Sequence, residues 1–155
     1  MGCVAVAGKL KADKHMIKVW PADRAFANVI KIAGGYTCQR CNTVYPPKHR
    51  GLHLSHHISR GNWSVRFEPS NAFIHCYGCH RWLGARPDVF VVWARQKLGD
   101  TRYEMLIDAS RDLDRGRRAR REKKDIAKHY RQQLRIMQSR RDKGELGNYM
   151  VIGYD

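Results

Sequence analysis

Two short cysteine motifs set the expected fold of this chain, namely CQRC at residues 38–41 and CYGC at residues 76–79. Each C-x2-C pair forms a knuckle that presents two sulfurs on one side, and 34 residues separate the two pairs. Four thiolates from two such knuckles are typical of a tetrahedral zinc site, whereas the alternative interpretation is a redox-active pair. The expected ligands of a structural Zn²⁺ are Cys38, Cys41, Cys76 and Cys79. We expect Cys3 to be an ordinary thiol.

The residues around the second knuckle predict a small α+β unit. Apolar and polar residues alternate over 52–59, Gly61-Asn62 forms a turn signal, and 63–67 reads as the returning strand. A helix is expected over residues 76–83. Strand, turn, strand and helix make a ββα unit, and the zinc lies at its base.

Composition divides the chain into a basic N-terminal segment (1–35), the zinc-bound core (36–85), a helical extension (86–143) and a tail (144–155). In the first part we expect short strands at 4–6 and 16–20 and a helix at 25–32. In the extension, one helix over 89–98 and a second from 101 to about 113 precede the most basic stretch.

Residues 115–143 hold thirteen Lys and Arg against three acidic residues, a net charge of +10. Ile126, Tyr130, Leu134 and Met137 recur at helical spacing, which predicts one long basic helix with a narrow apolar stripe. The stripe either pairs two copies of the chain or folds back on its own core. Basic side chains neutralise DNA phosphates and release counterions. The expected DNA contacts are Arg117, Arg118, Arg120, Arg121, Lys123 and Lys124.

The composition of all 155 residues favours a folded protein with a polyanionic partner. Hydrophobic residues make up 43%, enough for a packed core, and the net charge is +16. Such a charge is uncommon in an enzyme for small neutral substrates, and it favours nucleic acid over an anionic membrane. The apolar run 89–94 is too short to span a bilayer. No basic stretch precedes the first apolar residues, so we expect a cytoplasmic protein without a secretory signal.

Histidines between and beside the knuckles point to hydrolytic chemistry. Residues 53–61 read HLSHHISRG, Asn71 follows, and His80 comes directly after Cys79. Phosphodiester hydrolysis needs a base for water and a cation for the developing charge and the leaving oxygen. A neutral histidine is a suitable base near pH 7.

The segments HHISRG (56–61), RFEPSN (66–71) and CYGCH (76–80) resemble the NinG/Rap recombination proteins of lambdoid phages. The usual pattern of that family is Gly-His-aromatic-x-Ser-Arg-Gly, then Arg-Phe-x-x-x-Asn, then Cys-x2-Cys-Asn. The resemblance covers about residues 36–110. It implies an HNH, or ββα-metal, fold and a metal-dependent endonuclease that acts on branched DNA such as Holliday junctions and D-loops. The location would then be the cytoplasm of the phage's host.

Carried over by position, the resemblance makes His56 the general base, Asn71 the residue that ties the loop to the hairpin, and His80 the first ligand of a catalytic Mg²⁺ or Mn²⁺. The pair His56-His57 leaves an alternative, in which His57 is the base and His56 a ligand. The second metal ligand is His53 or His57.

Further expectations concern the partners of this site. Arg60 and Arg66 are expected to grip the phosphates that flank the cut, and two coordinated cuts in a junction make a homodimer plausible. Two other functions stay open, namely a zinc-dependent DNA-binding protein without cleavage activity and an HNH nuclease with sequence preference, as in packaging or homing.

Overall fold

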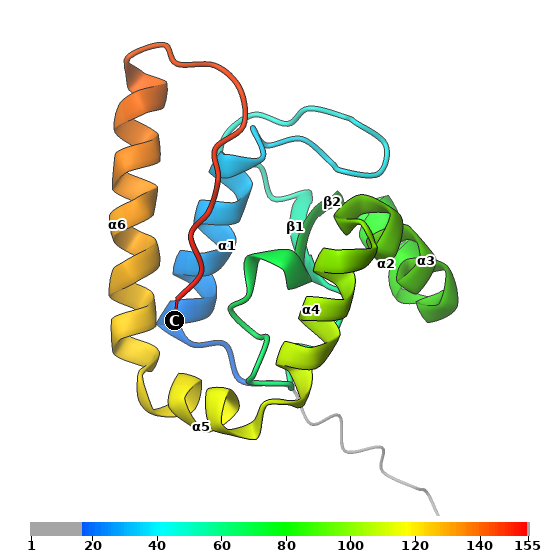
Figure 1. Cartoon of the computed structure of the whole chain (residues 1–155). Coiled ribbons are helices and arrows are strands. Elements are labelled where there is room, and N and C mark those ends of the chain that lie inside the picture. Colours follow the sequence, from blue (N-terminus) through cyan, green and yellow to red (C-terminus); the bar gives the residue numbers. More distant parts are fainter. Residues whose placement is uncertain (1–16, 155) are drawn as a thin grey trace, which may run out of the picture.

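The computed structural model describes residues 17–154; Cys3 and the expected strand at 4–6 lie outside them. Residues 17–20, part of another expected strand, have no regular secondary structure. The elements are α1 (Pro21–Ala33), β1 (Leu52–His56), the 3-10 turn η1 (Pro69–Asn71), β2 (Ala72–Cys76), α2 (Tyr77–Gly84), α3 (Pro87–Leu98), α4 (Asp100–Arg111), α5 (Leu113–Arg121) and α6 (Lys123–Asp142). Figure 1 shows this α+β arrangement, in which helices surround one small sheet.

The sheet has two antiparallel strands, and its register pairs Leu52 with Cys76 and His56 with Ala72. The expected return strand over 63–67 is therefore wrong, because β2 lies nine residues later. Val65 and Phe67 are buried, but they lie in the loop between the strands. Ser64 and Arg66 are buried as well, so the alternation of apolar and polar residues in the sequence does not mark two sides of a strand.

The main core lies between the sheet, α1 and α6, which run side by side in Figure 1. The rings of Phe26 and Tyr130 are 4.9 Å apart, and the Tyr130 hydroxyl donates to the Phe67 carbonyl at 2.6 Å. Ile126 and Met137 of the same α6 stripe are buried in this core. The stripe thus folds back on its own chain, which decides between the two expectations.

The basic region is two helices, so the single helix expected over 115–143 is wrong. The chain turns at Glu122, and in Figure 1 α5 lies along the bottom of the molecule and leads into the lower end of α6. Gly116 of α5 packs closely on the loop after β1, where an added Cβ would lie 2.9 Å from the Ser64 Oγ. α5 packs on this loop, whereas α6 packs on α1. These two contacts turn the chain at Glu122, where the sequence has no proline or glycine to indicate the end of a helix.

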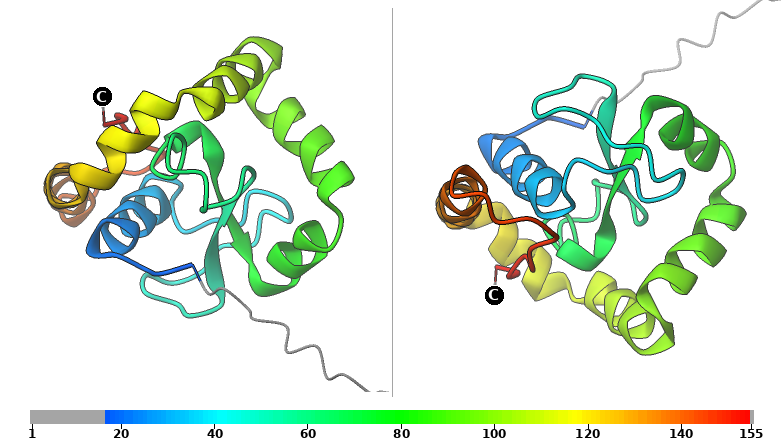
Figure 2. Two further views of the ribbon diagram at one scale, coloured as in Figure 1. Left: turned by 90° about the horizontal axis from the view of Figure 1, so that it is seen from below. Right: turned by 90° about the horizontal axis from the view of Figure 1, so that it is seen from above.

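A second, smaller core joins β2 to α2, α3 and α4 through Phe73, Leu83, Phe90 and Tyr103. Figure 2 shows that α3, α4, α5 and α6 follow one another around the sheet. The segment after α6 runs back beside α1 (Figure 1), where the Tyr149 amide donates to the Ala33 carbonyl. Within residues 17–154 no helix has both the length and the apolar character needed to cross a membrane.

Candidate functional site

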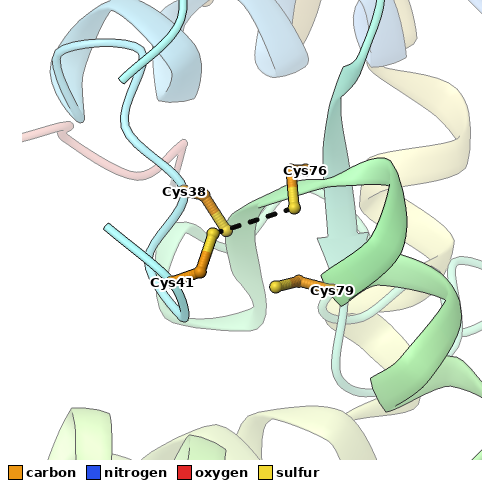
Figure 3. Close-up of side chains that lie close together, drawn as sticks. All are labelled: Cys38, Cys41, Cys76 and Cys79. Carbon is orange, nitrogen blue, oxygen red and sulfur yellow. Dashed lines mark hydrogen bonds between the residues drawn. The ribbon is translucent and has the colours of Figure 1, made fainter. Parts of the chain in front are cut away.

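Four cysteine sulfurs converge beside the end of β2, as the sequence predicted (Figure 3). The Sγ atoms of Cys38, Cys41, Cys76 and Cys79 all lie within 4.8 Å of one another. Those of Cys41 and Cys76 are 3.8 Å apart. A tetrahedron with metal–sulfur bonds of about 2.3 Å has edges of about 3.8 Å, so the residues fit a structural Zn²⁺.

Backbone hydrogen bonds fix both knuckles. The Asn42 amide donates to the Cys38 carbonyl at 2.8 Å, and Asn42 adopts φ 59°, a left-handed conformation that asparagine tolerates. Gln39 joins this knuckle to β2, because its amide donates to the Ile74 carbonyl and its Oε1 accepts from the Ile74 amide. The first knuckle is therefore held against the strand that leads to the second.

The cysteine cluster needs a cation to ionise fully. Hydrogen bonds from Thr43 lower the pKa of Cys41 to about 6, whereas burial raises the pKa of Cys79 to about 12. The guanidinium of Arg40 donates to the Cys79 Sγ at 3.5 Å and stacks 3.9 Å from the Trp82 ring. Four thiolates around Zn²⁺ carry a net charge of −2, which this arginine partly offsets.

His80, in the first turns of α2, faces the sheet and belongs to a hydrogen-bonded chain of side chains. Its Nδ1 lies 2.6 Å from the Ser55 Oγ, and the same Oγ lies 2.8 Å from the Nδ1 of His75. Ser55 and His75 are buried on the side of the sheet that faces α2 and α3. The hydroxyl has one proton, so Ser55 donates to one imidazole and accepts from the other.

Of the two candidates for the second metal ligand, only His53 lies beside His80. The His53 ring stacks on His80 with centroids 5.4 Å apart, but His57 turns toward Tyr103 and Phe90 instead. Within residues 17–154 the four cysteines are the only group of three or more His, Cys, Asp or Glu side chains close enough to share an ion. No third histidine, cysteine or carboxylate within residues 17–154 completes a group with His80 and His53.

His56 lies on the opposite side of the strand from Ser55, so its side chain points away from His80. Its ring packs 6.2 Å from that of Phe26 in α1. The Nε2 lies 3.0 Å from the Arg66 carbonyl oxygen, which only accepts, so Nε2 carries the proton and Nδ1 the lone pair. Burial lowers the pKa of His56 to about 4, which keeps the ring neutral at pH 7.

The two candidate bases differ in access to solvent. The Nδ1 of His57 is buried without a hydrogen-bond partner, and its Nε2 lies 3.0 Å from the Tyr103 hydroxyl. The Nδ1 of His56 also makes no hydrogen bond within the described residues, yet it is not among the buried unpartnered atoms. Both ring nitrogens of His57 are thus buried or bonded, whereas the Nδ1 of His56 has no partner among the described residues.

Asn71 fastens the loop that follows β1. It is fully buried, its Oδ1 accepts from the Ile58 amide at 2.7 Å, and its Nδ2 donates to the carbonyls of Ile58 and Val65. These three bonds fix the backbone two residues after His56. The position of Asn71 matches the tying role expected from the resemblance.

Arg66 cannot contact DNA in this fold, so that expectation is wrong. Its side chain is 1% exposed and forms a two-pronged ion pair with Asp23 of α1, with both N–O distances at 2.8 Å. It also donates to the carbonyls of Arg60 and Lys18. Arg60 remains partly exposed, and its positive charge is close enough to His56 to lower that pKa further.

The other expected DNA contacts lie on α5 and the start of α6. The exposed members of this group are Arg117, Arg118, Arg120, Arg121 and Lys124, and Lys123 is half-buried. The junction between α4 and α5 docks on the loop that follows His56, because the Ser64 hydroxyl donates to the Asp112 carbonyl and the Asn62 side chain donates to the Ser110 carbonyl at the end of α4. Arg117 and Arg120 of α5 line one surface hollow together with Asn62 and Ser64 of this loop.

Sequence reasoning missed Ser55 and His75. Strand periodicity was the available signal, since His53 and Ser55 share one side of β1 and the register sets His75 opposite His53. Comparison of the chain with protein-family models, curated proteins and solved structures gave no match. The resemblance to NinG/Rap proteins thus depends on the quoted motifs alone.

Proposed function

We propose that this chain is a zinc-stabilised, metal-dependent DNA endonuclease of the HNH type that acts on branched recombination intermediates. The observation that carries the proposal is the β1–loop–β2–α2 unit, which holds His56 at the end of β1, Asn71 in the loop and His80 in α2 beside the four cysteines. This is the order of chemical groups that the motif resemblance requires.

In the proposed reaction His56 is the base. Its Nε2–H is fixed by the Arg66 carbonyl, so Nδ1 takes the proton of the attacking water. A pKa of about 4 makes the imidazole a weak proton acceptor, and a bound phosphate beside it would raise that pKa by its negative charge. Arg60 would hold a neighbouring phosphate. The lone pair of His57 is buried, which favours His56 as the base.

His80 would hold the catalytic Mg²⁺ or Mn²⁺ through its Nε2. If the His80 Nδ1–H donates to Ser55 and the Ser55 hydroxyl donates to His75, the lone pair of His80 faces outward. The chain supplies no three-residue ligand group here, so water and phosphate oxygens would complete the coordination. When bound, the ion would stabilise the charge on the phosphate and on the leaving 3′-oxygen.

The opposite directions of the His56 and His80 side chains define where the substrate would lie. Both sides of β1 can be reached together only past the end of the strand. The scissile phosphate is therefore proposed to lie over the end of β1, between the two imidazoles, with α5 supplying the contacts to the adjacent DNA backbone. A homodimer would need a surface other than the α6 stripe, which is buried against α1.

A nicking assay tests this function. Wild type, His56→Ala and His80→Ala are incubated with supercoiled plasmid, a four-way junction, a D-loop and linear duplex, with Mg²⁺ or Mn²⁺. We expect cleavage to fall by about 10²–10⁴-fold in both variants, since each removes a group that acts on the reacting phosphate. His129→Ala, which alters a histidine on α6, is the matched control. Equal rates in wild type and both variants would contradict the mechanism.

The second candidate is a DNA-binding zinc protein without cleavage activity. It is favoured because, within residues 17–154, the four cysteines are the only group of three or more possible ligands close enough to share an ion. Tight junction binding by wild type with no cleavage in either metal would establish it. A preference for linear duplex of one sequence over branched DNA would instead identify an HNH nuclease of the packaging or homing kind.

A further inference from the structure

A basic hollow lies between α1, α6 and the loop that precedes β1, away from the candidate catalytic residues. Its volume is about 580 Å³, and four cationic side chains line it, together with aromatic and amide groups. The cations are Lys31, Lys48, Arg50 and Arg135. None of the nine lining residues is acidic.

These four cations have no counter-charge among the described residues. Across residues 17–154, no ion pair or side-chain hydrogen bond involves any of them. By contrast, Arg115 and Arg117 of α5 pair with Glu68 and Asp114. Grouping like charges without counter-charges costs free energy, and an anion in the hollow would remove that cost.

The hollow is separate from α5. Arg135 follows the start of α6 by about 18 Å at the rise of an α-helix, so the hollow lies on the half of α6 distant from α5 (Figure 1). Loop residues Lys48 and Arg50 are exposed, and Lys31 and Arg135 face them from two packed helices. The cations thus come from three segments held in one place.

We propose that this hollow is a second DNA-backbone site, which holds phosphates of a DNA segment other than the one on α5. The inference deepens the proposed function, on which it rests, because a branched substrate presents more than one duplex arm. Lysine and arginine without acidic partners bind phosphates independently of sequence. The site would therefore add affinity without adding sequence preference.

Binding measurements test the site without requiring cleavage. The zinc-loaded full chain is titrated against a fluorescent four-way junction without Mg²⁺ or Mn²⁺, at several salt concentrations. For Lys48→Gln/Arg50→Gln we expect the Kd to rise by roughly tenfold and the slope of log affinity against log salt to fall by about 2. Arg135→Gln, on a different element, should lower the slope by about 1.

The matched control is Lys97→Gln/Arg102→Gln, which removes the same charge from exposed positions on α3 and α4. Equal effects of the two double variants would overturn the proposal, because net charge alone would then explain the loss. Lost binding to phosphatidylserine vesicles with an unchanged Kd for DNA would overturn it as well. If wild type binds the junction and the variants weaken that binding as expected, but wild type cleaves nothing, the second DNA-backbone site is supported and the nuclease function is contradicted.

Discussion

The two sides of the β1–β2 sheet hold their histidines through different interactions. On the side of α1, His56 packs against Phe26 of the main apolar core, and one backbone carbonyl fixes its proton. On the side of α2, a buried serine hydroxyl connects His75 to His80, and the His80 ring is stacked on that of His53. One side thus orients a single imidazole by packing, and the other orients several through side-chain hydrogen bonds.

This difference matches the two roles proposed for His56 and His80. The apolar side fixes which nitrogen of His56 accepts a proton, whereas the polar side leaves His80 a ring nitrogen for another ligand. Neither role needs the other histidine nearby. The comparison therefore locates the proposed chemistry at the strand end, and each of the following changes tests one side of it.

The largest effect is expected from Cys76→Ser, which disturbs both sides at once by breaking the junction between β2 and α2. Binding of zinc to structural sites supplies about 10–16 kcal/mol in small domains, and we expect the free energy of unfolding to fall by about 5 kcal/mol or more. Zinc content and urea unfolding measure this loss. Cys3→Ser should retain one zinc per chain. Full zinc retention in Cys76→Ser would contradict the assignment.

The next largest effect is expected on the side of α1 from Asp23→Ala. This change leaves the Arg66 guanidinium buried without its carboxylate and removes the acceptor of the Trp20 amide at the start of α1. Breaking a buried ion pair typically costs about 3–5 kcal/mol. Urea unfolding should show a loss of that size, with a smaller one for Asp23→Asn. A loss below about 1 kcal/mol would mean that the pair is not buried in solution.

A smaller effect is expected on the side of α2 from Ser55→Ala. Removing the hydroxyl leaves the buried His75 Nδ1 without a partner, which costs about 1–3 kcal/mol. Adding His75→Phe should recover part of that loss, and the double-mutant cycle measures the coupling. If Ser55 also orients His80, nicking by Ser55→Ala falls by about 10–100-fold. Strict additivity of the two changes would refute the hydrogen-bonded chain.

The smallest effect is expected on the side of α1, in the pH dependence of stability due to His56. The pKa of His56 is about 4 in the folded chain because of burial, against an ordinary value of 6.5. The unfolded chain therefore binds the proton first, and stability is lost as the pH falls from about 6.5 toward 4. Thermal unfolding of His56→Gln, whose amide can still donate to the Arg66 carbonyl, should depend less on pH in this range. Parallel pH profiles would show that His56 is not buried.

Local features of the fold could be predicted from the sequence, and features that depend on distant packing could not. The knuckles follow from a three-residue spacing, so the cysteine cluster was predicted correctly. The helices after the second knuckle begin and end near the expected residues, where Pro87 and Gly99 mark the boundaries. These signals depend on the backbone within one turn or one helix.

The errors share a physical origin. The apolar residues over 63–67 lie in a loop and not in a strand. Side-chain hydrogen bonds from Asn71 and Arg66 hold this loop in place, without the backbone hydrogen bonds of a sheet. Burial of Arg66 depends on Asp23, which lies 43 residues earlier in the chain. The turn at Glu122 results from the packing of α5 on the loop after β1 and of α6 on α1, and the local sequence indicates neither contact. Each case required knowledge of which elements meet.

Packing of α6 on α1 also limits how the chain's affinity for DNA can be altered. Deleting everything after α4 would strip Phe26 and its neighbours of their cover, and the shortened product would misfold before any change in affinity could be interpreted. Single substitutions at outward-facing positions of α6 avoid this problem. The inward residues of α6 pack against α1, and the outward residues contact solvent. Mutation or evolution can therefore change the electrostatic attraction of α6 for DNA while thermal stability stays the same.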